Sequence, residues 1–222
     1  MPNSFNFSPA EVRNRRLSDD DYEMGLGWRV MYSMGMPLLY ICAFLLGIVA
    51  VICNGIVTKY WTDLEPPMCY LYSSTPSQSL FYKFGGSISS CQWVTYGGVT
   101  ALIFLTVSAL IYFIAVRGTG KLTLPLFVLE VLSMLGTILM LAVTCTLTEG
   151  LRQTCASMGL NQLNMRGENC HALLNLRVAN YNLSVSSSTL IQGAMFTFWP
   201  CTVLMCIITI FHLCSCYRRC YR

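Results

Sequence analysis

Residues 122–148 read LTLPLFVLEVLSMLGTILMLAVTCTLT, a long apolar run in which Glu130 is the only charged side chain. A hydrocarbon core about 30 Å thick is crossed by roughly 20 helical residues, so this run is long enough to span a bilayer. Backbone amides find no water inside a bilayer, which favours a helix over an open strand. Since Glu130 follows Lys121 by about nine residues, or roughly 13 Å along a helix, we expect it close to mid-membrane.

Three further runs have the same character. The chain is 55% hydrophobic and only 11% charged, whereas soluble domains carry about 25% charged residues. We predict an all-α integral membrane protein, a four-transmembrane-helix bundle with spans at 30–57, 93–116, 122–147 and 190–214. The four spans form one transmembrane domain, residues 30–217, which includes two outer loops at 58–92 and 148–189. An N-terminal tail, residues 1–29, precedes it, and a basic tail, residues 218–222, follows it.

The basic residues indicate the orientation of the bundle. Nine of the 14 Lys and Arg residues fall in three short segments on one side: Arg13, Arg15, Arg16 and Arg29, then Arg117 and Lys121, then Arg218, Arg219 and Arg222. Short cytosolic segments are enriched in Lys and Arg, so we expect both termini in the cytosol and the two long loops outside or in a lumen. The expected location is the plasma membrane or a secretory or vesicle membrane, with the first span acting as its own insertion signal.

Five cysteines lie on the expected outer side, where disulfides persist: Cys69, Cys91, Cys145, Cys155 and Cys170. The simplest pairs are Cys69 with Cys91 and Cys155 with Cys170, and each bridge would stabilise its loop by about 3 kcal/mol. Spacing does not fix the connectivity, so Cys145 remains an alternative partner in either pair and full reduction remains an alternative to both.

Short motifs predict covalent modifications on both sides of the membrane. Asn182-Leu183-Ser184 is a glycosylation sequon in the second outer loop, whereas the sequon at Asn6 lies on the expected cytosolic side and is attributed to chance. Ser18 follows a pair of arginines, which makes it a phosphorylation candidate in what is otherwise a solvated tail.

The C-terminal sequence FHLCSCYRRCYR places three thiols beside basic residues. Juxtamembrane cysteines of this kind are candidates for S-palmitoylation: Cys214, Cys216 and Cys220. We prefer lipidation or plain thiols to a zinc site, since the run offers only three thiols and His212 is expected inside the helix.

Aromatic residues gather near the first outer loop: Tyr60, Trp61, Tyr70, Tyr72, Trp93 and Tyr96. They are interpreted as an interfacial aromatic belt, with an exposed partner-binding face as the alternative. Small residues in the spans, such as Ala43 and Gly47, predict close helix packing, either within the bundle or between copies.

The sequence offers little for catalysis. It lacks phosphate-binding glycine loops and the HExxH and GxSxG motifs, and its two histidines, His171 and His212, are expected on opposite sides of the membrane. We therefore expect no enzyme, cofactor, metal or nucleic-acid partner, the last because a net charge of +4 is small and scattered. For the intramembrane acid Glu130 we expect a neutral hydrogen bonder inside the bundle, with Ser108 or Thr106 as its partner, rather than a partner or pore contact.

Two cysteine contexts suggest a family. The stretch MCYLY after span 1, and SCQWVTYGGVTALIFL leading into span 2, resemble the synaptogyrin and synaptophysin type of MARVEL tetraspan. They are equally similar to the transmembrane protein 179 family, over roughly residues 30–215. Claudins share the four spans, but their W-G-L-W motif is absent here. The resemblance implies a non-enzymatic membrane component of vesicles or of a larger channel or receptor, with Cys69 and Cys91 as a loop bridge.

These observations favour an accessory or scaffold protein that binds another integral membrane protein, such as an ion channel or receptor, through its spans and outer loops. One alternative is the pore-forming subunit of a homo-oligomeric channel. A second alternative is a vesicle-trafficking tetraspan that sorts membrane. Membrane lipid is a partner in all three cases.

Overall fold

A computed structural model describes residues 34–63, 67–73, 86–117, 123–157 and 186–220. The chain divides into two compact units, Met1–Leu39 and Tyr40–Arg222. The first unit contributes only the beginning of the first helix to the described residues, so the packing described for this protein is that of the second unit. Several predicted sites lie outside the described residues: Asn6, Ser18, Cys170, His171 and Asn182.

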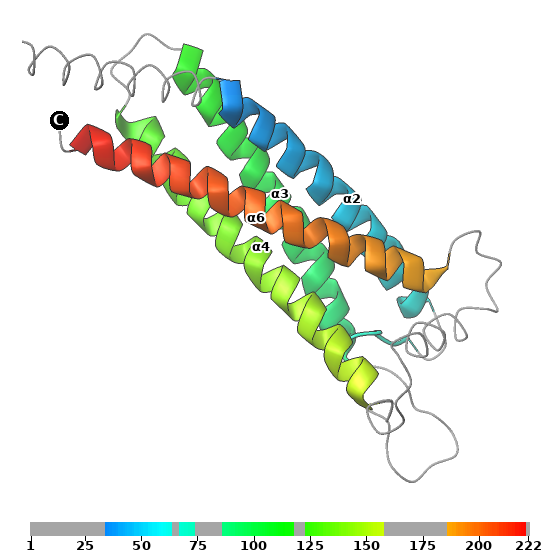
Figure 1. Ribbon diagram of the computed structural model, residues 1–222. Helices are drawn as coiled ribbons and strands as arrows, with labels where there is room; N and C mark the ends of the chain where they lie inside the picture. Colours follow the sequence, from blue (N-terminus) through cyan, green and yellow to red (C-terminus); the bar gives the residue numbers. More distant parts are fainter. Residues whose placement is uncertain (1–33, 64–66, 74–85, 118–122, 158–185, 221–222) are drawn as a thin grey trace, which may run out of the picture. The chain divides into compact units, whose positions relative to one another are not determined.

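Four long helices make up most of the described chain (Figure 1): α2 (Met36–Thr62), α3 (Ile88–Arg117), α4 (Thr123–Ser157) and α6 (Ser187–Cys220). Each is long and apolar enough to cross a membrane, which confirms the predicted number of spans. Pro37 and Pro125 lie in the first turns of α2 and α4, where a missing N–H costs no helical hydrogen bond. Pro200 lies inside α6.

Helix α4 packs along both α3 and α6 (Figure 1). Gly97 on α3 lies opposite Val143 on α4, and Gly136 on α4 lies opposite Phe104 on α3. A Cβ atom added at these glycines would stand 2.7 Å from the Val143 side chain and 3.1 Å from that of Phe104, respectively. The helices therefore run antiparallel and approach closely because these positions lack side chains.

The predicted small-residue pair on α2 also packs inside the bundle. Ala43 is fully buried, and its carbonyl oxygen accepts a hydrogen bond from the Cys201 thiol at 3.2 Å. A Cβ at Gly47 would meet Leu102 at 2.4 Å. The sequence left open whether these small residues pack within the bundle or between copies. In the structure they pack within the bundle, between α2, α3 and α6.

Helix α4 is longer than predicted. It ends at Ser157, whereas the predicted span ends at 147. Glu130 lies about two turns after Thr123, the first residue of α4, and its mid-membrane depth stays a prediction. The sequence prediction ended the span at the first charged residue after Leu147, but Glu149 and Arg152 neutralise each other on the helix surface at 2.8 Å.

Candidate functional site: a disulfide-tethered cap

A short segment after α2, residues 67–73, is tied to the beginning of α3 by a disulfide, and we call this segment the cap. The bridge joins Cys69 to Cys91, with their Cα atoms 5.8 Å apart. Both half-cystines are buried, at 0% and 1% exposure. This pairing confirms the simplest of the predicted connectivities for the first loop.

The structure assigns different states to the two other predicted disulfide cysteines that it describes, Cys155 and Cys145. Cys155 near the end of α4 is also disulfide-bonded, and its bond partner lies outside the described residues. Cys145 is a free, exposed thiol, so the alternative in which it replaces a partner of either bridge is wrong. The pairing of Cys155 with Cys170 stays a prediction.

A buried amide, Asn54 on α2, connects the cap to α3. The Tyr70 hydroxyl donates to Asn54 Oδ1, and Asn54 Nδ2 donates to Thr95 Oγ1 at 2.8 Å. Thr95 in turn donates to the carbonyl oxygen of Cys91 at 3.1 Å. Because Tyr70 follows Cys69 in the chain, these bonds and the disulfide close one ring.

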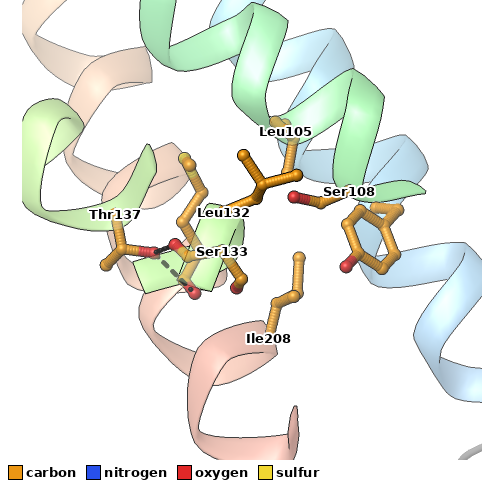
Figure 2. A pocket seen from close by; sticks show the side chains of 8 residues that line it. Leu105, Ser108, Leu132, Ser133, Thr137 and Ile208 are labelled. Carbon is orange, nitrogen blue, oxygen red and sulfur yellow. Dashed lines mark hydrogen bonds between the residues drawn. The ribbon is translucent and has the colours of Figure 1, made fainter. Parts of the chain in front are cut away.

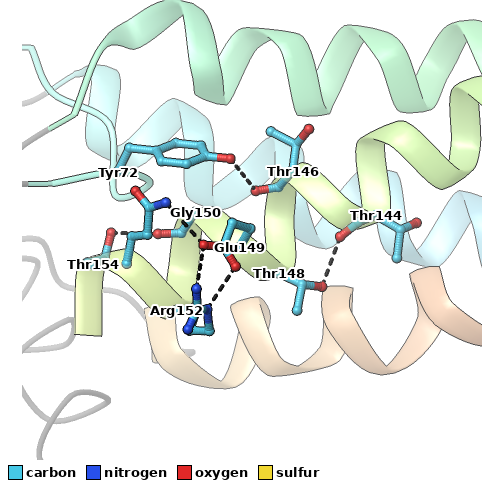
Figure 3. Close-up of polar contacts among 9 residues, drawn as sticks. Tyr72, Thr144, Thr146, Thr148, Glu149, Gly150, Arg152 and Thr154 are labelled. Atoms are coloured by element: carbon cyan, nitrogen blue, oxygen red, sulfur yellow. Dashed lines mark hydrogen bonds and ion pairs between the residues drawn. The ribbon is translucent and has the colours of Figure 1, made fainter. Parts of the chain in front are cut away.

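Helix α4 holds the other side of the cap (Figure 3). The Tyr72 amide donates to Gly150 O at 3.2 Å, and the Ser73 amide donates to Thr154 Oγ1 at the same distance. The Thr154 hydroxyl lies 2.9 Å from Tyr70 O, and the Tyr72 hydroxyl donates to the carbonyl oxygen of Thr146 at 3.4 Å. The cap backbone is thus paired with α4 rather than with solvent.

The sharp path of the cap depends on tight backbone contacts. Tyr72 has a φ of 55°, a left-handed conformation that is uncommon for a residue with a side chain. The Gly86 amide donates to Cys69 O at 2.8 Å, and a Cβ on Gly86 would lie 1.8 Å from Leu71 O. Within the described residues Cys69 and Gly86 form a single antiparallel bridge outside any named strand.

Two of the predicted belt residues are instead the core beneath the cap. Trp61 is 0% and Tyr70 is 1% exposed, with ring centroids 6.2 Å apart, whereas Tyr72 is half-buried. Burial raises the pKa of the Tyr70 hydroxyl, and the hydrogen bond with Thr58 opposes that shift. For these residues both predicted roles, belt and exposed partner face, are wrong.

The remaining aromatics behave differently. Trp93 and Tyr96 on α3 are 47% and 67% exposed, and Tyr60 is half-buried. The exposed pair lies within two turns of Cys91 along α3, at the same end of the bundle as the cap. This position fits an interfacial aromatic belt and equally a contact surface.

At the opposite end of the bundle lies a second buried polar group. His212 on α6 is 4% exposed, and its Nε2 lies 2.8 Å from the Tyr40 hydroxyl of α2. The Tyr112 ring of α3 stands 6.0 Å from the His212 ring and 5.8 Å from that of Tyr40. This histidine cross-links three helices.

Between the two ends, hydroxyl pairs connect α4 with α6. Their Oγ atoms are 2.8 to 2.9 Å apart: Ser133 with Thr209, Thr137 with Thr209, and Thr144 with Thr202. Beside them, side chains from all four helices line a narrow void, which has no room for a water molecule (Figure 2). The Ser108 hydroxyl in its lining is buried without a hydrogen-bond partner among the described residues.

The predicted partners of Glu130 do not bind it. Thr106 donates to Leu102 O of its own helix at 2.8 Å, and Ser108 is the unpaired hydroxyl of the void. Glu130 itself is half-buried. The helical register explains this, since Leu129 and Ser133 face the interior and Glu130 lies about 100° away from Leu129 around the axis.

The other candidate residues are scattered. Cys214 is exposed and Cys216 half-buried on the last turns of α6, which ends at Cys220. Among the described residues no group of three His, Cys, Asp or Glu is placed to hold a metal ion. The functional side chains that the sequence analysis missed are Asn54, Thr95, Thr154 and Tyr40; only Asn54, an amide within the run IVAVICNGIV, carried a visible signal.

Four apolar helices with a disulfide-tethered cap define a four-span membrane protein. Residues 34–222 match the family described as the transmembrane protein 179/179B Claudin domain, and the chain belongs to this family. The absence of W-G-L-W therefore does not exclude a claudin-type domain, while the MARVEL resemblance stays a prediction. No curated protein and no solved structure matches the chain.

Proposed function

We propose that this protein is a non-enzymatic accessory or scaffold subunit, which binds another integral membrane protein, an ion channel or receptor complex, through its spans and its capped end. The orientation that accompanies this proposal has both termini in the cytosol and the cap outside or in a lumen, in the plasma membrane or a secretory membrane. The distribution of Lys and Arg supports it.

The observation that carries the proposal is the rigid attachment of the cap next to exposed aromatic rings. A disulfide, the Asn54 amide and the bonds to α4 fix residues 67–73 on three helices. A surface that is already ordered loses little conformational entropy when a partner binds. Exposed Trp and Tyr side chains are frequent anchors in interfaces, and Trp93 and Tyr96 are exposed at the same end of the bundle as the cap.

The test is purification of the full-length, tagged protein from native membranes in a mild detergent, followed by cross-linking and mass spectrometry. The proposal expects one foreign membrane protein in stoichiometric amount, cross-linked near the cap. Replacing Trp93 and Tyr96 together by alanine should release it. The matched control replaces two exposed residues farther along the same helix, Ile103 and Leu110, by alanine and should retain it.

Other outcomes of the same experiment separate the alternatives. Recovery of copies of this chain alone, together with a new conductance on expression in oocytes, would replace the proposal by the homo-oligomeric pore. At the level of the void a single bundle has no water-sized passage, so such a pore would lie between copies. Recovery of trafficking machinery from a vesicle fraction would favour the sorting tetraspan.

A further inference from the structure

We infer that Asn54 is a positioning residue that keeps the cap closed over the Cys69–Cys91 disulfide and thereby controls the access of thiol reductants to it. The inference does not depend on the proposed function. It concerns a bond that is buried on both sides, with exposures of 0% and 1% for its two cysteines. A thiolate must reach a sulfur atom directly to exchange with it, so the buried bridge reacts only when the cap opens.

The hydrogen-bond inventory makes Asn54 the central link. Its carbonyl oxygen accepts from Tyr70, and its amide nitrogen donates to Thr95 at 2.8 Å. Thr95 donates its own proton to Cys91 O at 3.1 Å. The Thr58 hydroxyl, 3.1 Å from Thr95, also hydrogen-bonds Tyr70 and runs parallel to this link. Asn54 uses two separate groups, so its bonds to the cap and to α3 form at the same time.

The burial of Asn54 makes the loss of its hydrogen bond to the cap more costly. Its side chain is 1% exposed, and opening the cap takes the Tyr70 donor away from Asn54 Oδ1. An unsatisfied buried polar group is more costly than the net gain from one hydrogen bond. The Cys69–Cys91 disulfide and the hydrogen bonds of Asn54 close the same ring, so each of them restrains the other.

The reaction that probes this arrangement is balanced by a dithiol. One thiolate of dithiothreitol attacks a sulfur of the Cys69–Cys91 bond, and the other cysteine leaves as a thiolate. The second thiol of the reagent then displaces the first cysteine. Two cysteine thiols form, and dithiothreitol is oxidised to its cyclic disulfide.

The experiment measures reduction of this bond in the full-length protein in detergent, by trapping free thiols and mapping peptides with mass spectrometry over time. At high dithiothreitol the wild-type rate should reach a plateau, because cap opening becomes limiting. Asn54→Leu and Thr95→Val should each raise the rate about tenfold, since a lost buried hydrogen bond is worth roughly that factor. Thr95→Val covers the case in which Asn54→Leu fails to fold.

The control is Thr100→Val on the same helix, whose hydroxyl donates to Tyr96 O of its own helix at 2.8 Å; its rate should equal that of the wild type. The combined Asn54→Leu and Thr95→Val variant should be no faster than either single variant, because both remove the same link. Two results would overturn the inference: wild-type reduction without a plateau at the rate of an exposed disulfide, or wild-type rates in both single variants.

Discussion

The Oγ1 atoms of Thr137 on α4 and Thr209 on α6 lie 2.8 Å apart, and Thr209 also lies 2.8 Å from Ser133 Oγ. One hydroxyl of α6 thus serves two of α4, a full turn apart. Between helices in a membrane, burial of apolar surface supplies no driving force, because lipid tails are equally apolar. Hydrogen bonds of this kind therefore contribute to holding α6 against α4.

Replacing Thr209 by valine should weaken this contact. The substitution removes both bonds without changing the volume, and interhelical hydrogen bonds of this type contribute about 0.6 to 1.7 kcal/mol. We expect a loss of about 1 kcal/mol in the free energy of unfolding in detergent. Thr146→Val is the control, since its hydroxyl bonds only to Ala142 O of its own helix at 2.8 Å; equal losses in both variants would contradict the interhelical role.

Two glycines offer a matched test of the cap. A Cβ on Gly86 would collide with the Leu71 carbonyl oxygen at 1.8 Å, whereas a Cβ on Gly55 would meet only a Thr95 methyl group at 3.8 Å. We expect Gly86→Ala to lower the free energy of unfolding by about 3 kcal/mol, because the collision is with backbone. Gly55→Ala should melt at the wild-type temperature, and a Gly86→Ala variant that did the same would be inconsistent with the path of the cap.

Alkaline pH should loosen the cap through Tyr70. Burial raises the pKa of this hydroxyl in the folded protein, whereas in the unfolded chain it stays at about 10. The neutral hydroxyl therefore contributes stability fully below pH about 10, and that contribution is lost as the pH rises toward the folded-state pKa. Thermal unfolding between neutral and alkaline pH should show this loss, and Tyr70→Phe should show a smaller one; identical pH profiles would refute the role of Tyr70.

Acylation should discriminate between two neighbouring cysteines. Cys214 lies on the same exposed stripe of α6 as Ile210 and Tyr217, which are 58% and 63% exposed. Cys216 is half-buried and lies about 200° around the helix from Cys214. In an acyl-exchange assay Cys214→Ser should therefore lose more signal than Cys216→Ser. The reverse order, or no acylation in the wild type, would count against S-palmitoylation at Cys214.

Neutralising Glu130 should leave assembly intact. The residue is half-buried on α4, and glutamine keeps its shape and its capacity to form hydrogen bonds. We expect Glu130→Gln to retain surface expression and any partner recovered by native purification. A lost partner with normal surface expression would assign Glu130 to the interface instead.

The number of helices was predictable because each apolar run is longer than a bilayer needs, and no tertiary contact was required to see it. The end of α4 was not predictable in this way, because the 2.8 Å contact between Glu149 and Arg152 lets the helix continue past two charges. A hydropathy argument treats those charges as a boundary.

In the cap, the disulfide could be predicted from the sequence, but the burial of its aromatic residues could not. The Cys69–Cys91 pair was visible as a spacing, but Trp61 and Tyr70 were assigned to the membrane interface because single residues do not disclose what covers them. Their burial depends on the bonds to Asn54 and Thr154, which are 16 and 84 residues away from Tyr70 in the chain. Contacts of that range follow from the fold as a whole rather than from local pattern.

The length of the helices bears on the thickness of the membrane that suits this protein. The candidate membrane-spanning helices are 27 to 31 residues long, which corresponds to about 40 to 46 Å along a helix axis. A typical hydrocarbon core is about 30 Å thick, and sterol-rich plasma membranes are a few ångströms thicker than those of the endoplasmic reticulum. Hydrophobic mismatch should therefore tilt the bundle strongly in thin bilayers and favour its accumulation in thick ones, a sorting effect independent of any partner.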